Sequence, residues 1–188
     1  MTITKYKTIL IDPPWNETGG GKIKRGADKH YKLLKTPDIL EVIKTSGVFN
    51  PDDDCHLYLW VTNNFLKDGL WLIEQLGFRY ITMVTWVKDR FGLGYYFRGQ
   101  TEHILFSTRG HVFPLHKGNP NIKTPTTILN AKRTKHSKKP MEQYEIIESV
   151  STGPRLEMFA RHTMSGWDSW GNEIDEQTVK QNKLDMGF

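Results

Sequence analysis

The sequence has little cysteine, because Cys55 is the single one among its 188 residues. One cysteine can form neither an internal disulfide nor a cysteine-cluster metal site, so a disulfide-stapled secreted fold is excluded and a reducing cytoplasm is expected. No apolar run approaches the length that crosses a bilayer, and the stretch MTITKYKTIL lacks the apolar core and cleavage site of a secretory signal. We therefore expect no membrane partner.

The chain also lacks the motifs of several enzyme classes. Its triple glycine, residues 19–21, belongs to no phosphate-binding GxxxxGK[ST] pattern. The histidines show no HExxH or other metal-ligand spacing, so no metal is expected. No serine or cysteine stands in the context of a covalent nucleophile, which favours chemistry without a covalent enzyme intermediate.

What the chain does contain indicates a globular protein with a basic surface. Hydrophobic residues make up 37% and charged residues 25%, the balance of a folded domain. Lysine and arginine total 26 against 21 acidic residues, a formal net charge of +5. This excess favours a polyanionic partner such as nucleic acid, although charge alone leaves that open. We expect a single domain over residues 1–175 and a polar tail over residues 176–188.

Short apolar runs alternate with amphipathic stretches along the chain. Helices are predicted from Thr36, used as a hydroxyl cap, to Gly47, from a cap at Asn63 or Asn64 to Gly77, and from Pro140 to Val150. Strands are predicted at residues 6–11, 56–62, 80–88, 102–108, 126–132 and 155–160. The alternation predicts an α/β fold with a mainly parallel sheet flanked by helices, in which ligands bind outside the carboxyl ends of the strands.

The stretch Asp12-Pro13-Pro14-Trp15 follows the first predicted strand, at such a carboxyl end. One interpretation is an ordinary strand-ending turn capped by the acid. The other is catalytic, because the prolines hold a carboxylate, two carbonyls and a flat ring in one place. A carboxylate and a proline carbonyl could accept the two N–H groups of a nucleobase amine and draw its lone pair out of conjugation. The aromatic ring would then stack on the base.

Three further stretches are candidate contacts to nucleic acid. The loop after the motif carries Lys22, Lys24 and Arg25, and a second basic cluster at residues 132–139 contains Arg133. These cations are expected to meet phosphates; the alternative is that they are simply solvated. In the third stretch, Tyr96 and Arg98 lie in a glycine-bordered aromatic loop, which could meet unstacked bases or pack in the core.

The motif and its surroundings resemble a known family. DPPW after a strand is similar to the signature of the N(6)-adenine methyltransferases, the family that contains the catalytic subunit of the eukaryotic messenger-RNA adenosine methyltransferase and many phage and bacterial DNA adenine methylases. The resemblance extends over nearly the whole chain, through the segments YLWVTN, WVKD, GYYFRGQTEHIL, HSKKP and LEMFARH…W…GNE.

This resemblance implies a Rossmann-like methyltransferase fold, S-adenosylmethionine as methyl donor and adenine as acceptor. It implies that the DPPW residues Asp12, Pro13, Pro14 and Trp15 form the catalytic motif. Tyr31 corresponds to the residue that gates or contacts the target base. The implied donor-binding residues are Asp12, Lys139, Glu157, Arg161, Asn172 and Glu173.

The sequence therefore predicts an enzyme that methylates N(6) of adenine in DNA, with the target base flipped out of the duplex. We expect it in the cytoplasm of a bacterium or of a phage-infected cell. RNA is the alternative substrate, and a catalytically silent nucleic-acid-binding subunit is the alternative from another class. The pattern leaves open whether the protein forms a homodimer or joins a second methyltransferase subunit.

Overall fold

The computed structural model describes residues 4–17, 33–92, 96–112, 114, 115, 117, 119, 121, 123–133, 138–171 and 174. The elements in chain order are β1 (Tyr6–Ile11), α1 (Thr36–Thr45), β2 (Pro51–Thr62), the 3-10 helix η2 (Asn63–Phe65), α2 (Leu66–Gln75), β3 (Arg79–Val87), β4 (Thr101–Arg109), β5 (Ile128–Asn130), α3 (Glu142–Val150), β6 (Arg155–Met158) and β7 (Asp168–Trp170). Within these described stretches, every helix is too short or too polar to cross a lipid bilayer.

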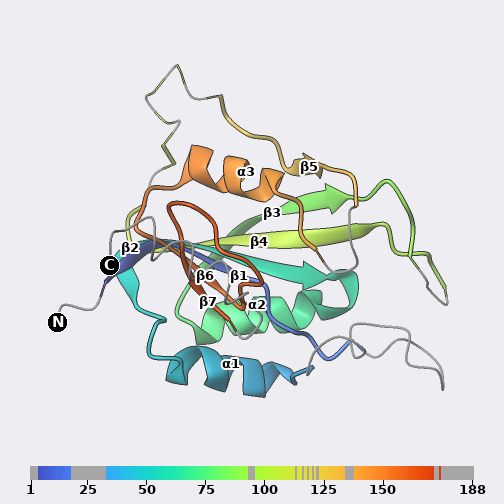
Figure 1. The fold of residues 1–188 in the computed structure, drawn as a ribbon, viewed down its shortest axis with the longest axis horizontal. Helices are drawn as coiled ribbons and strands as arrows, with labels where there is room; N and C mark the ends of the chain where they lie inside the picture. Colours follow the sequence, from blue (N-terminus) through green and yellow to red (C-terminus); the bar gives the residue numbers. More distant parts are fainter. Residues whose placement is uncertain are drawn as a thin grey trace.

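The strands form one seven-stranded sheet in the order β5-β3-β4-β2-β1-β6-β7 (Figure 1). Four of its neighbouring pairs are parallel, namely β1 with β2, β1 with β6, β3 with β5 and β6 with β7. The two antiparallel pairs both involve β4, which lies between β2 and β3. The predicted α/β fold with a mainly parallel sheet flanked by helices is confirmed.

Helices cover both faces of the sheet and bury two apolar clusters. In Figure 1, α1 and α2 lie on one side of the sheet and α3 lies on the other. Ile39 of α1 and Ile73 of α2 pack on the first face, together with alternate residues of β1 such as Ile9. Tyr144 and Ile147 of α3 pack on the second face. Because β1 is covered on both sides, Thr8 and the three apolar residues that follow it, Ile9 to Ile11, form a continuous buried run, as is typical of a central parallel strand.

The reversed direction of β4 follows from how it is connected. The described residues between β3 and β4, 88–92 and 96–100, contain no helix, and Lys88 and Gln100 pair across this connection through the Lys88 N–H and the Gln100 carbonyl (2.9 Å). A hairpin joins only antiparallel strands, whereas a parallel pair needs a crossover. The first residues of β4, Thr101 to His103, therefore lie at the same edge of the sheet as the last residues of β1, β2 and β3.

Local signals placed most element ends to within two residues. Strand β1 spans Tyr6–Ile11 as predicted, and α1 begins at Thr36. Gly77 ends α2 with φ +79°, while its N–H and that of Phe78 donate to the carbonyls of Glu74 and Ile73. This left-handed turn is the glycine signal on which the prediction relied.

The predicted side-chain caps of the first two helices are wrong. The Thr36 hydroxyl donates to Asp68 of α2 (2.6 Å) instead of capping its own helix. Asn63 and Asn64 precede α2 but bond to Thr101 and Glu17 respectively, and no side chain caps this helix. Tertiary partners therefore replaced the local capping bonds. The short strand β7 was not predicted, and β2 begins at Pro51 instead of His56.

Candidate active site

The carboxyl edge of the sheet brings Asp12 to the centre of a group of charged side chains. Asp12 directly follows β1, between the parallel strands β2 and β6. Its backbone N–H donates to the carbonyl of Met158 in β6 (3.3 Å), which continues the strand pairing by one residue. Its side chain is 12% exposed, so a carboxylate stands at the edge of the sheet with limited contact to water.

Backbone hydrogen bonds hold the two prolines that follow. The N–H of Trp15 donates to the carbonyl of Pro13 (2.9 Å), and the N–H of Leu34 donates to the carbonyl of Pro14 (2.9 Å). Because a carbonyl oxygen has two lone pairs, each proline can still accept one further hydrogen bond from a ligand. The motif is thus a fixed turn with acceptor capacity left over.

Trp15 has a structural position that differs from the expected one. Its indole is 6% exposed, donates from Nε1 to the carbonyl of Trp60 (2.8 Å) and stacks on Phe65 with ring centroids 5.3 Å apart. The ring is therefore committed to the core beneath the motif. The expectation that it stacks on a target base is wrong, because the ring is buried and already stacks on Phe65.

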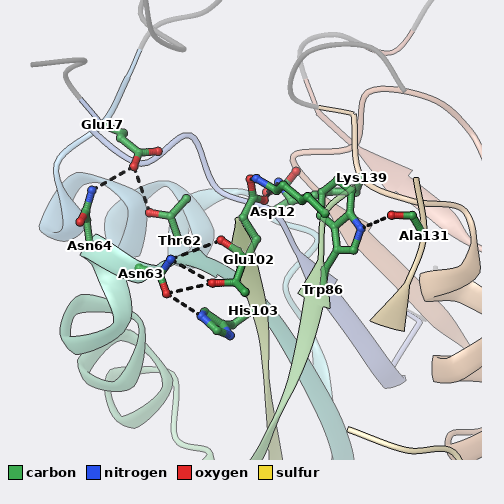
Figure 2. Close-up of polar contacts among 12 residues, drawn as sticks. Asp12, Glu17, Thr62, Asn63, Asn64, Trp86, Glu102, His103, Ala131 and Lys139 are labelled. Atoms are coloured by element: carbon green, nitrogen blue, oxygen red, sulfur yellow. Dashed lines mark hydrogen bonds and ion pairs between the residues drawn. The ribbon is translucent and has the colours of Figure 1, made fainter. Parts of the chain in front are cut away.

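Five side chains of alternating charge form an ion network around Asp12; Figure 2 labels three of them, Asp12, Glu102 and Lys139. The Nζ of Lys139 lies 2.7 Å from Oδ1 of Asp12 and 3.4 Å from Oε2 of Glu102. Lys88 pairs with the other oxygen of Glu102, and Nη2 of Arg161 lies 3.9 Å from Oδ2 of Asp12. We call this set, in the order Arg161–Asp12–Lys139–Glu102–Lys88, the ion network.

The partners within the ion network keep its buried members charged. Burial by itself lowers the pKa of Lys139, but Asp12 and Glu102 outweigh that effect and raise the pKa. Burial likewise favours the neutral form of Glu102, yet Lys139 and Lys88 outweigh it and lower the pKa of that carboxyl. Lys139 therefore stays an ammonium and Glu102 a carboxylate at neutral pH.

Glu157 lies deeper than the ion network, on β6. It is 5% exposed, and the hydroxyl of Tyr144 donates to its Oε2 (2.8 Å). Burial is the main cause that raises the pKa of Glu157 to about 7; the bond from Tyr144 opposes this and the charge of Asp12 adds to it. The structure thus places Glu157 behind Asp12 as a carboxyl that exchanges its proton near neutral pH.

Polar side chains tie together the strand ends that surround the ion network (Figure 2). Asn63 bonds to the hydroxyl of Thr101 (3.1 Å) and to Nε2 of His103 (2.8 Å), and Nδ1 of His103 bonds to the hydroxyl of Thr85 (3.0 Å). Burial is the larger of the two effects on His103 and lowers the pKa of its imidazole, so a neutral ring is held here. Strands β2, β3 and β4 are thereby fixed to one another beside Glu102.

A second polar contact anchors the chain where it leaves the motif. Oε1 of Glu17 accepts bonds from the hydroxyl of Thr62 (3.3 Å) and from Nδ2 of Asn64 (3.2 Å). Glu17 is the last described residue before the segment 18–32. The described chain is therefore attached, at Glu17, to the end of β2.

The remaining predicted substrate contacts that the structure describes lie along the β3–β4 hairpin and beside it. Tyr96 is 87% exposed, and the guanidinium of Arg98 lies over the ring of Phe91, 3.8 Å from its centroid. Core packing, the alternative interpretation, is excluded for Tyr96. The N–H of Arg133 donates to Asp89 (2.9 Å), which places Arg133 beside the same hairpin and, as the largest effect, lowers the pKa of Asp89.

Two groups of predicted residues differ in what the structure says of them. Asp12, Lys139, Glu157 and Arg161 lie close together in one site, and their predicted roles stay predictions. Six others lie outside the described residues, and their predicted roles stay predictions: Lys22, Lys24, Arg25, Tyr31, Asn172 and Glu173.

Sequence reasoning did not assign roles to Glu102 and Tyr144. Glu102 enters the site only because β4 runs antiparallel, so its first residues meet the carboxyl ends of the other strands. The absence of any helical pattern between the third and fourth predicted strands was the signal that could have revealed this. Tyr144 was predicted as an apolar-face residue of its helix, and its hydroxyl contact to Glu157 had no local signal.

Comparison with known proteins places this site in context. The model of the MT-A70 family matches residues 6–173. The chain is 29% identical over 200 residues to the type II methyltransferase M.MunI of Mycoplasma sp, covering 94% of this chain and 81% of that protein. Residues 6–173, the range that the family model matches, include the DPPW motif and every member of the ion network.

Longer proteins also match nearly all of this chain. The putative N(6)-adenosine-methyltransferase MT-A70-like of Medicago truncatula is 30% identical over 177 residues, covering 90% of this chain and 26% of that protein. The N(6)-adenosine-methyltransferase catalytic subunit METTL3 of Homo sapiens is 28% identical over 180 residues, covering 91% of this chain and 28% of that protein. The chain thus spans about a quarter of these relatives but most of the type II methyltransferase.

Proposed function

Because the chain belongs to the MT-A70 family of methyltransferases, we propose that it transfers a methyl group from S-adenosylmethionine to N(6) of adenine in DNA. The observation that carries the proposal is the contact between Asp12 and Lys139 at the carboxyl edge of the sheet, where such folds bind their ligands. A motif carboxylate and an ammonium are already adjacent there, in a position with little water.

The residues present fit the proposed donor. S-adenosylmethionine would supply an electrophilic methyl group on a sulfonium, and its amino acid end carries one ammonium and one carboxylate. Asp12 and Lys139 offer the two opposite charges that such an end requires. Arg161 lies beside Asp12, and Glu157 lies behind it. We assign these four residues to donor binding, together with Asn172 and Glu173 by resemblance.

Asp12 would also act on the acceptor. An adenine amine is a poor nucleophile because its lone pair is conjugated with the ring. If Asp12 accepts one N–H and the carbonyl of Pro13 or Pro14 accepts the other, the lone pair turns out of the ring plane toward the methyl group. Such positioning is worth up to roughly 7–11 kcal/mol in ideal cases. The backbone bonds that fix both prolines support this role, because they hold the acceptors still.

The hairpin between β3 and β4 supports nucleic acid as the substrate. Tyr96 and Phe97 are 87% and 90% exposed beside the carboxyl edge, and Arg98 adds a cation. Exposed aromatic rings next to cations suit unstacked bases, which an enzyme that extrudes its target base must accommodate. The basic residues Lys22, Lys24, Arg25 and Arg133 would contact phosphates, and Tyr31 would contact the target base.

We place DNA before RNA because the chain is similar to the type II methyltransferase M.MunI along 81% of that protein. A homodimer or a second subunit is included in the proposal, since one relative is named a catalytic subunit. Light scattering of the purified protein would measure which assembly forms.

The deciding experiment incubates the protein with radiolabelled donor and either duplex DNA or RNA, followed by digestion to nucleosides. We expect label in N(6)-methyldeoxyadenosine. Label in N(6)-methyladenosine alone would assign the RNA alternative, and label on cytosine would contradict the proposal. Absence of label from both polymers, combined with no heat of donor binding in calorimetry, would assign the silent-subunit alternative.

A further inference from the structure

Lys139 contacts two carboxylates, and only one of them belongs to the DPPW motif. Its Nζ is 2.7 Å from Asp12 and 3.4 Å from Glu102. The side chains of Lys139 and Glu102 are only 15% and 18% exposed, so solvent compensates neither charge fully. Lys88, which is 16% exposed, contacts Glu102 from the other side. Glu102 thus binds two cations at once, although the mechanism above gives it no role.

The contact between Asp12 and Lys139 has to loosen when the donor binds in the proposed position. The donor ammonium would pair with Asp12, and the donor carboxylate would pair with Lys139. Since the two side chains now touch at 2.7 Å, donor entry has to separate them. During that exchange an ammonium in a poorly solvated site needs another anion, or it loses its proton or leaves the site.

We propose that Glu102 is a positioning residue that holds the ammonium of Lys139 at the carboxyl edge while the donor takes Asp12 away from it. The donor then replaces the pair between Asp12 and Lys139 with two new pairs, one to Asp12 and one to Lys139. Because Glu102 stays beside Lys139, the lysine has an anionic partner throughout. Lys88 anchors Glu102 for this purpose. This inference rests on the proposed function. Its first test therefore uses the donor-free protein, so that the result can be judged even if the proposed function fails.

The charges in the ion network predict how the donor-free protein responds. Burial lowers the pKa of Lys139, and the carboxylates of Asp12 and Glu102 together outweigh that effect. Glu102→Gln removes one of these charges without changing the shape of the side chain. Lys88→Met is the matched control, because it removes a neighbour of Glu102 but leaves the carboxylate beside Lys139.

The first test is an NMR titration of lysine side chains labelled with ¹³C, with Lys139 assigned by the loss of its signal in Lys139→Met. We expect Glu102→Gln to lower the pKa of Lys139 by about one unit or more. Lys88→Met should leave that pKa unchanged or raise it. An unchanged titration of Lys139 in Glu102→Gln would overturn the inference, as would an equal fall in both variants, which would indicate general loosening of the site.

The second test measures donor affinity by calorimetry from pH 6 to pH 10, without nucleic acid. Affinity of the unmodified protein should depend little on Lys139 across this range, because the lysine stays charged. Relative to the unmodified protein, the affinity of Glu102→Gln should fall as the pH rises through the lowered pKa of Lys139, by up to about tenfold per unit. Lys139→Met should bind more weakly than the unmodified protein at every pH, and Glu102→Asp should restore part of the affinity that Glu102→Gln loses at high pH.

The two tests separate failure of the inference from failure of the proposed function. If Glu102→Gln binds donor like the unmodified protein at every pH, the positioning role is wrong although the function stands. A pH-independent loss equal to that of Lys139→Met would also contradict it, because Glu102 would then act directly on the donor. If the unmodified protein binds no donor, the proposed function fails and the donor exchange with it, while the titration still decides whether Glu102 holds Lys139.

Discussion

The hydroxyl of Tyr144 donates a hydrogen bond to Oε2 of Glu157, 2.8 Å away, behind the DPPW motif. The two residues come from α3 and β6, and both are almost completely buried. A second atom close to this hydroxyl is Nε2 of His162 (3.3 Å). Burial lowers the pKa of His162, and the nearby Lys138 and Arg161 add to that effect. The hydroxyl of Tyr144 therefore lies within hydrogen-bond distance of both a neutral His162 and the carboxyl of Glu157.

We predict that Glu157 makes the protein less stable as the pH rises. Its pKa is raised from 4.5 to about 7, so between these values the folded protein keeps a proton that the unfolded chain has lost. The free energy of unfolding therefore falls with rising pH, by up to about 3 kcal/mol from this group. Glu157→Gln removes this contribution, and urea unfolding at pH 5 and pH 8 measures it.

The relevant quantity is the difference between Glu157→Gln and the unmodified protein, because other groups titrate in the same range. The free energy of unfolding of Glu157→Gln, minus that of the unmodified protein, should rise from pH 5 to pH 8. The exposed Glu74 provides the control, since Glu74→Gln should show the same difference at both pH values. An equal difference for Glu157→Gln at both pH values would contradict the raised pKa.

We predict that Asp12→Asn abolishes most methyl transfer without unfolding the protein. The amide keeps the shape but loses the charge that pairs with Lys139 and that we assign to the donor and the amine. A loss of kcat of at least about 10²–10³-fold is expected for one electrostatic contact in a water-poor site. Labelled methyl incorporation and a thermal melt measure the two effects, and exposed Asp38→Asn is the control. Turnover close to that of Asp38→Asn would rule out the catalytic role.

We predict that Trp15→Phe affects stability more than substrate affinity. The variant loses the indole N–H that satisfies the buried carbonyl of Trp60, at a cost of about 1–3 kcal/mol. DNA affinity at a temperature where both proteins are folded should stay within about twofold, since the ring lies in the core. Chemical unfolding and fluorescence anisotropy provide the measurements. A stable variant with much weaker DNA binding would show that the ring does reach the base.

We predict the opposite pattern for Tyr96→Ala and Phe97→Ala. Both rings are almost fully exposed, so each change should alter the free energy of unfolding by less than about 0.5 kcal/mol. Each should weaken binding to DNA by about 1–3 kcal/mol if a base stacks on the ring. Tyr80→Ala, at the other end of β3, removes a ring that is 42% exposed and should leave DNA binding unchanged. Unchanged binding in both hairpin variants would exclude a stacking role.

The exposed aromatic hairpin shows where sequence reasoning could only offer alternatives. A glycine-bordered loop with several aromatic residues has the same sequence pattern whether its rings are buried or exposed. In the structure Tyr96 is exposed, because the hairpin extends beyond the end of the sheet (Figure 1). No helix of the described chain is placed to cover it.

Sequence by itself determined the features whose causes are local. The apolar run of β1, the prolines behind it and the glycine turn at Gly77 are set by side-chain burial and allowed backbone angles, so Asp12 could be placed at a strand end from the sequence alone. Tertiary structure decided everything that depends on a partner distant in the chain. Glu102 meets Lys139 because β4 runs antiparallel, and Trp15 turns into the core because Trp60 and Phe65 receive it. Hydrogen bonds and ion pairs between remote residues leave no periodic trace in a sequence, since only the folded chain brings their members within a few ångströms.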